Sequence, residues 1–225
     1  MIKAVLLDID DTLLDFDKNA ALALELACKK YNVPFLDSYP ALFHKVNDTL
    51  WDRVEKRTLT RNGLYEIRFP LVFKEWGTDC VDKPGFELEF RRRLATLAEK
   101  MDGAVELLDY LKGRYILCAA SNCEYAQQVS RLQTAGILSY FDKLFFSETI
   151  GHPKPSKEFF DYTLSALAPL SPDEILMIGD SPNADIAGAK TVGYKTCFFA
   201  HGKRASIPCD PDYRVSNLDE IRSIL

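Results

Sequence analysis

The chain has 225 residues, enough for one large domain or for a core with an insert, since a domain takes about 150 residues. With 47% hydrophobic and 27% charged residues, its composition is globular and excludes disordered, collagen-like and fibrous classes. The net charge of −5 argues against a surface built for nucleic acid polymers or anionic membranes, because both would repel the chain.

Short apolar runs along the chain predict strands that are buried on both faces. They lie at residues 3–7, 115–120, 143–146, 175–178 and 194–199. Helical patterns stand between the later runs, at residues 103–112, 125–135, 156–168 and 184–191. Strands that alternate with helices predict an α/β fold with a Rossmann-like parallel sheet.

Residues 15–102 interrupt this alternation. They contain no convincing buried strand, and their apolar residues follow helical spacing at 20–27, 41–54, 64–76 and 86–97. We therefore expect an inserted α-helical domain at 15–102 and a core made of 1–14 and 103–225. The basic run 91–93 within the insert is expected to be the solvated face of a helix.

The chain shows no sign of a membrane or secretory destination. No apolar run approaches the length of about 18 residues that a membrane span needs, and acidic residues interrupt the first apolar run too early for a signal peptide. The cysteines have no Cys-x-x-Cys spacing and predict reduced, mostly buried thiols: Cys28, Cys80, Cys118, Cys123, Cys197 and Cys209. We expect a cytoplasmic protein.

Asp8-Ile9-Asp10-Asp11-Thr12 follows the first apolar run directly. Residues two apart in an extended chain point to the same side, so Asp8 and Asp10 can converge on one site. Two such close carboxylates repel each other unless a cation or a shared proton relieves the repulsion. Taken alone, the string could also be an acidic turn.

Each later strand of the core is followed by polar residues that could reach the same carboxyl edge of the sheet, where open parallel sheets carry their sites. These residues are Ser121, Asn122, Lys154, Asp180 and Asp185. Asp8, Asp10 and Asp180 offer hard oxygen ligands suited to Mg²⁺. Lys154 and Ser121 would hold the phosphoryl oxygens on which charge spreads during transfer.

This constellation resembles the haloacid-dehalogenase-like (HAD) superfamily, whose four motifs occur here in order. They stand as Asp8-x-Asp10-x-Thr12, Ser121, Lys154, and Gly179-Asp180 with Asp185. The resemblance implies a Rossmann-like core with a helical cap inserted after the first motif. It therefore implies the same insert that the helical spacing predicts.

The resemblance also implies roles for individual residues. Asp8 would attack phosphorus and form an aspartyl-phosphate, and Asp10 would act as general acid and then as general base. Mg²⁺ would be held by the Asp8 carboxylate, the Asp10 backbone carbonyl and Asp180, with Asp185 acting directly or through water. The dehalogenases of the superfamily lack a carboxylate at the position of Asp10, which favours phosphoester chemistry.

Other residues near the motifs carry weaker expectations. Thr12 and Asn122 are expected to contact the substrate, although Thr12 could instead support the loop. Ser121 could simply cap the following helix, and Asp185 could serve to cap or orient a neighbour. The histidines form no recognisable triad with a serine and are expected to be non-catalytic: His44, His152 and His201.

Three segments of the insert are similar to the cap of the pyrimidine 5′-nucleotidase branch, which handles ordinary and noncanonical nucleoside monophosphates. They are Trp51-Asp52-Arg53, Thr58-Leu59-Thr60-Arg61 and Tyr65-Glu66-Ile67-Arg68-Phe69. Arg68 is the cap residue expected to contact the substrate, because arginine offers a fixed fork of donors. The aromatic residues Trp51, Tyr65, Phe69, Phe73 and Trp76 could instead form the insert's own apolar core.

Three functions remain open at this point. The first is a Mg²⁺-dependent phosphatase of small phosphomonoesters, above all nucleoside 5′-monophosphates. The second is a sugar-phosphate or phosphoglycolate-type phosphatase or a phosphomutase. The third is a phospho-aspartate receiver, although such modules are about half this length and carry their acidic residue after a middle strand. The partner would be a small molecule, and the protein a monomer or homodimer.

Overall fold

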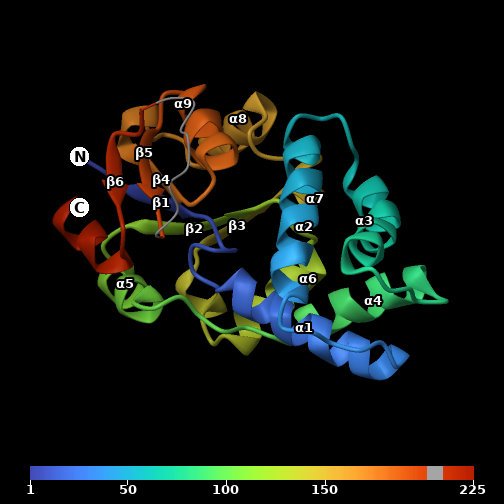
Figure 1. The fold of residues 1–225 in the computed structure, drawn as a ribbon. Coiled ribbons are helices and arrows are strands. Elements are labelled where there is room, and N and C mark those ends of the chain that lie inside the picture. Colours follow the sequence, from blue (N-terminus) through green and yellow to red (C-terminus); the bar gives the residue numbers. More distant parts are fainter. Residues whose placement is uncertain (202–209) are drawn as a thin grey trace. The chain divides into compact units, whose positions relative to one another are not determined.

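The computed structural model describes residues 1–201 and 210–225, and the chain forms two compact units. The core unit comprises Met1–Asp15 and Glu99–Leu225, and the helical unit comprises Phe16–Ala98 (Figure 1). The assignment of residues 1–14 with 103–225 as a catalytic core and of 15–102 as its cap stays a prediction. Each unit is described separately below.

The core unit is built on a six-stranded sheet in which every pair of neighbouring strands is parallel. The strands follow the order β3-β2-β1-β4-β5-β6. Their bounds are β1 Ala4–Leu7, β2 Ile116–Ser121, β3 Lys143–Phe146, β4 Ile175–Gly179, β5 Lys195–Phe199 and β6 Tyr213–Val215. The predicted α/β fold class is confirmed. The edge strand β6 is missing from the prediction because three residues, two of them exposed, give no apolar run.

Apolar side chains on both faces of the central strands make the core of this unit. Ala4 and Leu6 of β1 belong to one cluster with Met177 of β4 and with Phe159 and Phe160 of helix α8 (Lys157–Ala166), which precedes β4 in the chain. The four residues of β1 are buried throughout. A strand buried on both faces reads as a continuous apolar run, which explains why this element was visible in the sequence.

Helices alternate with the strands of the core unit, and their ends follow ordinary capping rules. Ser156 accepts a hydrogen bond from Phe159 N at 3.2 Å at the start of α8, and Gly136 follows α6 in the left-handed conformation (φ 73°). The α-helices are α5 Ala104–Leu111, α6 Tyr125–Thr134, α7 Ser147–Ile150, α8 Lys157–Ala166 and α9 Gly188–Lys190. Short 3₁₀ helices lie at Leu138–Tyr140, Pro172–Glu174 and Leu218–Ser223.

The helix predicted at 184–191 has a different form in the structure. A π-helical segment occupies Pro182–Ala187, and only the short α9 follows it. The Ser181 side chain accepts from Ala184 N at 3.0 Å, while the Asp185 carboxylate turns back to Ser181 N at 3.0 Å. These local contacts compete with regular α-helical hydrogen bonding and fix the position of Asp185.

Two segments of the core unit, one on either side of the helical unit in the sequence, run antiparallel to each other. Met101 N donates to Leu13 O at 2.9 Å, and Asp15 N donates to Glu99 O at 2.9 Å. An antiparallel bridge joins Leu14 and Lys100 between these bonds. The chain therefore leaves and re-enters the core unit through a paired two-segment connection.

The helical unit consists of α1 Phe16–Tyr31, α2 Tyr39–Glu55, α3 Arg61–Trp76 and α4 Lys83–Leu94 (Figure 1). Its interior is rich in aromatic rings, and Tyr39 stacks on Trp76 with ring centroids 4.1 Å apart. Phe69, Phe73 and Trp76 are buried in this cluster, whereas Trp51 and Tyr65 pack against it partly buried. These aromatics form the apolar core of the unit. No described helix is long and apolar enough to cross a membrane.

The described cysteines are buried or partly buried as predicted, whereas the basic run is only partly solvated: Arg92 is exposed, and Arg91 and Arg93 are partly buried. Cys28, Cys80, Cys118 and Cys197 are buried free thiols and Cys123 is partly buried, while Cys209 lies outside the described residues. Burial raises the pKa of Cys28, Cys118 and Cys197 to about 12, which makes these thiols poor nucleophiles. In the basic run, Arg92 and Arg93 pair with Glu89, and Arg91 lies 4.0 Å from the Tyr65 ring centroid.

Candidate active site

The strand order places the ends of β1, β2 and β4 side by side. Asp8 follows β1, and its backbone N–H donates to Ile178 O of β4 at 2.9 Å. Ser121 is the last residue of β2, and Asp180 comes directly after β4. In open parallel sheets, ligands bind outside the carboxyl ends of the strands, near the point where the strand order reverses. The structure thus brings most of the predicted site residues to one edge.

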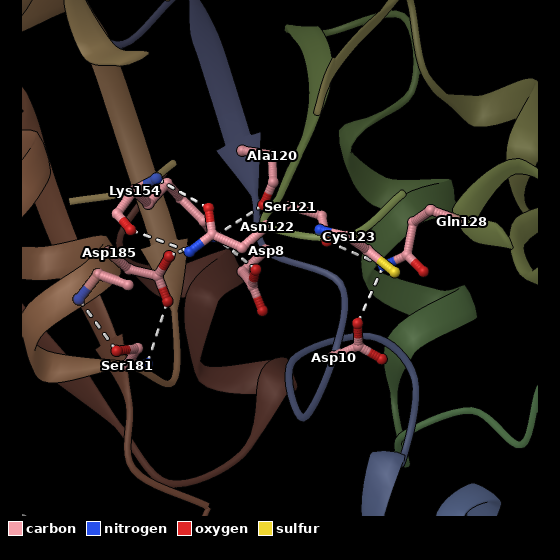
Figure 2. Close-up of polar contacts among 11 residues, drawn as sticks. Asp8, Asp10, Ala120, Ser121, Asn122, Cys123, Gln128, Lys154, Ser181 and Asp185 are labelled. Atoms are coloured by element: carbon pink, nitrogen blue, oxygen red, sulfur yellow. Dashed lines mark hydrogen bonds and ion pairs between the residues drawn. The ribbon is translucent and has the colours of Figure 1, made fainter. Parts of the chain in front are cut away.

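Lys154 lies at the centre of this edge with its side chain almost fully buried (Figure 2). Its Nζ donates to Asp8 Oδ1 at 2.6 Å, to Asp185 Oδ1 at 2.6 Å and to Ala120 O at 2.8 Å. An ammonium group has three protons, so every donor of Lys154 is in use. In this arrangement the lysine neutralises carboxylates. The expected contact of Lys154 with a phosphoryl oxygen is therefore corrected, because Lys154 has no free donor for it in this structure.

Three carboxylates form an acidic group around this lysine. Asp8, Asp180 and Asp185 each offer an oxygen, and these atoms lie within 4.8 Å of one another. Gly179 makes the arrangement possible, because a Cβ atom at this position would lie 2.1 Å from Asp185 Oδ2. With one lysine against three carboxylates, a net charge of about −2 remains when all are ionised. Oxygen ligands with this residual charge fit a divalent cation such as Mg²⁺.

The electrostatic environment of Asp8 also favours a bound cation. The pKa of the Asp8 carboxyl is raised to about 8, chiefly by burial; Lys154 opposes this rise, and the charges of Asp185 and Asp10 contribute to it. Burial alone would lower the pKa of Lys154, but Asp185 and Asp8 raise it above its usual value. Lys154 therefore stays charged, and additional positive charge at the acidic group would favour the ionised form of Asp8 that a nucleophile requires.

Asp10 has a different environment from Asp8, and its carboxylate does not belong to the acidic group. Arg131 Nη1 donates to Asp10 Oδ1, and Gln128 Nε2 donates to Asp10 Oδ2 at 3.0 Å. Gln128 and Arg131 come from α6 and are both buried. Neither residue was predicted as part of the site from the sequence. The helical pattern could have revealed them. Gln128 and Arg131 are three residues apart and therefore lie on one face of the helix, the inward-packing face that also carries Leu132.

The Ser121 hydroxyl is buried at the end of β2 and makes two hydrogen bonds, both as acceptor. Cys123 N donates to its oxygen at 3.2 Å, and Gln128 Nε2 donates to it at 3.1 Å. Among the described residues the hydroxyl proton has no acceptor. The alternative that Ser121 caps α6 is not realised, because Glu124 is the N-cap of that helix and makes no side-chain cap bond.

Two predicted substrate contacts are corrected by their surroundings. The side chain of Asn122 makes two hydrogen bonds to the backbone of Lys154. Asn122 Nδ2 donates to Lys154 O at 2.9 Å, and Lys154 N donates to Asn122 Oδ1 at 2.8 Å. Asn122 therefore positions the lysine. Thr12 is fully buried, and within the described chain its hydroxyl oxygen has no hydrogen-bond partner. A substrate cannot reach Thr12 in this structure.

Arg68 is also corrected as a substrate contact, because its guanidinium is enclosed within the helical unit. Arg68 Nε donates to Glu87 Oε2 at 3.0 Å, Nη2 pairs with Glu87 Oε1, and Nη1 donates to Asn47 Oδ1 at 2.9 Å. Rings of the aromatic cluster lie around it, with the Phe90 centroid 5.0 Å from Arg68 Cζ. The side chain is 4% exposed and serves the packing of α2, α3 and α4.

The contacts of the histidines in the described part of the chain do not include Asp8, Asp180 or Asp185. His44 Nδ1 is 3.3 Å from Asp17 Oδ1 inside the helical unit. His152 and His201 are exposed.

Comparison with known proteins places this geometry in a family. The family model for a haloacid dehalogenase-like hydrolase matches residues 2–193. The HAD-hydrolase YfnB of Bacillus subtilis is 33% identical over 224 residues, which are 99% of this chain and 95% of YfnB. A crystal structure of YfnB bound to magnesium superposes with a TM-score of 0.93 and covers 100% of this chain and 98% of YfnB.

Two further relatives carry names that state an activity. The pyrimidine 5′-nucleotidase PynA of Streptococcus pneumoniae is 33% identical over 227 residues, 99% of this chain and 94% of PynA. The pyrimidine 5′-nucleotidase YjjG of Escherichia coli is 30% identical over 223 residues, 98% of this chain and 96% of YjjG. The chain belongs to the haloacid dehalogenase-like hydrolases and is a phosphatase of that family.

Proposed function

We propose that the protein hydrolyses nucleoside 5′-monophosphates with Mg²⁺ and an aspartyl-phosphate intermediate on Asp8. The observation that carries the proposal is the buried group of Asp8, Asp180 and Asp185 around Lys154, which has more negative than positive charge. The magnesium bound to the similar YfnB structure supports the choice of metal. The names of PynA and YjjG support the choice of a pyrimidine nucleotide as substrate.

Asp8, Asp180 and Asp185, together with the backbone carbonyl of Asp10, would hold the metal ion. The ion would supply positive charge against the phosphoryl oxygens. A carboxylate oxygen of Asp8 forms a bond to phosphorus while the ester P–O bond breaks, and Asp10 gives a proton to the leaving oxygen. Asp10 then takes a proton from water as that water attacks phosphorus, which releases phosphate and restores the Asp8 carboxylate.

Ser121 suits a phosphoryl contact because its oxygen already accepts two hydrogen bonds, so its proton can be donated to a substrate oxygen. Lys154 keeps Asp8 and Asp185 together and compensates part of their charge. We assign the helical unit the role of a cap that selects the group attached to phosphate. The substrate would be a small phosphomonoester.

A phosphate-release screen of the purified protein with Mg²⁺ tests the substrate. The panel contains pyrimidine and purine 5′-monophosphates, the matching 3′-monophosphates, hexose phosphates and phosphoglycolate. We expect the highest kcat/KM for pyrimidine 5′-monophosphates. Release from sugar phosphates or phosphoglycolate without release from any nucleotide would contradict the nucleotidase proposal and support the second function. Transfer of phosphate within a sugar phosphate without release would indicate a mutase.

Chelation tests the metal. Exhaustive treatment with EDTA is expected to abolish phosphate release, and added Mg²⁺ to restore it, because the acidic group needs a cation to balance its charge. Binding of Mg²⁺ at 100 times its Kd should also stabilise the folded protein by about 2.7 kcal/mol. Asp180→Asn should weaken both effects. Full activity after chelation would contradict the metal site and leave Asp180 without its role.

A further inference from the structure

Two buried residues of α6, Gln128 and Arg131, lie beside the proposed site and have no part in the acidic group. Gln128 is fully buried, and the Arg131 side chain is 1% exposed. Within the described residues, Arg131 Nε and Nη2 have no hydrogen-bond partner. Burying unpaired donors costs free energy that an apolar residue of similar size would not cost. Packing alone therefore does not explain an arginine here.

The contacts of Arg131 determine the orientation of the Gln128 amide. Arg131 Nη1 donates to Gln128 Oε1 at 3.1 Å as well as to Asp10 Oδ1. Because the arginine can only donate, the oxygen of the amide must face it. The Nε2 group of Gln128 then faces Asp10 Oδ2 at 3.0 Å and Ser121 Oγ at 3.1 Å. Figure 2 shows Gln128 reaching toward Asp10 from α6.

This chain of contacts sets the direction of two groups at once. Asp10 receives one donor on each carboxylate oxygen, and each oxygen keeps a further acceptor position. Ser121 receives the Gln128 N–H, so its hydroxyl cannot donate to Gln128 and its proton points elsewhere. Without the arginine, the amide could turn over and present its oxygen to both groups.

We propose that Arg131 and Gln128 are positioning residues for the phosphatase reaction: they hold the Asp10 carboxylate and turn the Ser121 hydroxyl into a donor for the phosphoryl group. The inference rests on the proposed function, in which Asp10 transfers protons and Ser121 contacts phosphate. Neither positioning residue touches the substrate. They act through the residues that do.

A double-mutant cycle on kcat tests the link from Arg131 to Asp10. The substrate is phenyl phosphate, whose leaving group needs a proton at neutral pH. Arg131→Met should lower kcat about 10- to 100-fold, since small misplacements of reacting groups have effects up to about 10², and Arg131→Lys should recover part of it. In the Asp10→Asn background, Arg131→Met should have no further effect on kcat. Gln133→Leu, at an exposed position of the same helix, is the control and should match the wild type.

The outcomes separate the inference from the proposed function. If Asp10→Asn alone leaves kcat unchanged, the proposed role of Asp10 fails. If Asp10→Asn lowers kcat but Arg131→Met lowers it by the same factor in both backgrounds, Arg131 does not act through Asp10 and the inference is overturned. Thermal unfolding of every variant shows whether a loss of activity reflects loss of the fold.

Two substitutions of Gln128 test the link to Ser121, and they remain informative if the Arg131 variants fold poorly. Gln128→Glu keeps the shape and the contact with Arg131 but replaces the donor Nε2 by an acceptor oxygen. It should repel Asp10 and draw the Ser121 proton away from phosphate, so kcat should fall and KM should rise, each about 10-fold or more. Gln128→Met removes the donor without this reversal and should lose less. Equal losses in the two variants would overturn the proposed role of Gln128.

Discussion

Each unit buries a cation against carboxylates, but the two buried charge clusters differ in their balance. In the helical unit, Arg68 meets the single carboxylate of Glu87, and Asn47 accepts a further guanidinium N–H. In the core unit, Lys154 meets Asp8 and Asp185, with Asp180 beside them. The first cluster is neutral and enclosed. The second keeps an excess of negative charge.

This difference separates a structural ion pair from a candidate active site. A buried pair with matched charges and complete hydrogen bonding can remain as it is, and its removal is felt in folding. A buried cluster with unmatched charge lowers stability unless a ligand completes it, and the strongly perturbed pKa of Asp8 is the expected sign of such a site. Burial of an arginine or a lysine does not by itself distinguish the two cases.

Asp8→Asn should have the largest effect on activity and should show most clearly how the Lys154 cluster differs from the Arg68 cluster. The substitution removes the proposed nucleophile, so phosphate release should fall by at least about 10³-fold and trapping by beryllium fluoride should be lost. It also removes one carboxylate from a group that has more carboxylates than cations, so thermal unfolding without Mg²⁺ should occur at no lower temperature than in the wild type. Near-normal turnover would show that another residue is the nucleophile.

Lys154→Met should affect both activity and stability. It leaves Asp8 and Asp185 buried without their cation, and removing one partner of a buried pair lowers the free energy of unfolding by about 3–5 kcal/mol. Added Mg²⁺ should recover part of this loss, as followed by circular dichroism during denaturation. A variant that is equally stable with and without Mg²⁺ would argue against a cation site at these carboxylates.

Arg68→Met should reduce the stability of the helical unit. A loss of about 3–5 kcal/mol is expected, and Glu87→Leu in the same chain should return most of it, because an apolar pair can replace a buried ion pair. Both tryptophans, Trp51 and Trp76, lie in this unit, so tryptophan fluorescence reports its unfolding. KM for the best substrate of the double variant should match the wild type. A large rise in KM with normal stability would restore Arg68 as a substrate contact.

The smallest expected effect concerns Glu89 and the way in which the stability of the helical unit depends on pH. Hydrogen bonds from Arg92 hold the pKa of the Glu89 carboxyl below its ordinary value of 4.5, against the opposing effect of burial and with help from Lys30 and Arg93. A lowered pKa stabilises the folded state above about pH 4.5, and this stabilisation is lost as the pH falls further.

Glu89→Gln should therefore lower the free energy of unfolding at pH 7, and it should reduce the loss of this free energy between pH 5 and about pH 3. Tryptophan fluorescence during urea denaturation at several pH values measures both changes. Glu75→Gln, at a pair with exposed Lys45, serves as the control and should change little. If the stability of Glu89→Gln falls with pH as steeply as that of the wild type, other carboxylates cause the acid destabilisation.

Many elements of this protein were predictable from local pattern. Strands β1 and β4 are continuous apolar runs because both faces of the central sheet are buried. Asp8 and Asp180 directly follow strands, Ser121 ends β2, and Lys154 lies in the connection after β3 and α7. The topology of a parallel sheet gathers strand ends at one edge. The edge strand β6 escaped prediction because it has no apolar period of its own. The segment Pro182–Ala187 lies partly within the helix predicted at 184–191, but its π-helical form was not predicted.

The roles of individual polar side chains could not be predicted from local sequence pattern. Arg68 and Arg131 look alike in the sequence, each an arginine within a helical pattern, yet one pairs with Glu87 and the other with Asp10. Asn122 follows a strand like a site residue but holds the backbone of Lys154.

The sequence by itself determined the α/β core, the helical insert and the order of the charged motifs, because these depend on periodicity and on residue type along the chain. Only the tertiary structure decided which donors meet which acceptors: that Lys154 joins Asp8 to Asp185, and that α6 reaches Asp10 and Ser121. Hydrogen bonds and ion pairs act over about 3 Å, so partners distant in sequence are defined only when the packed elements bring their atoms together.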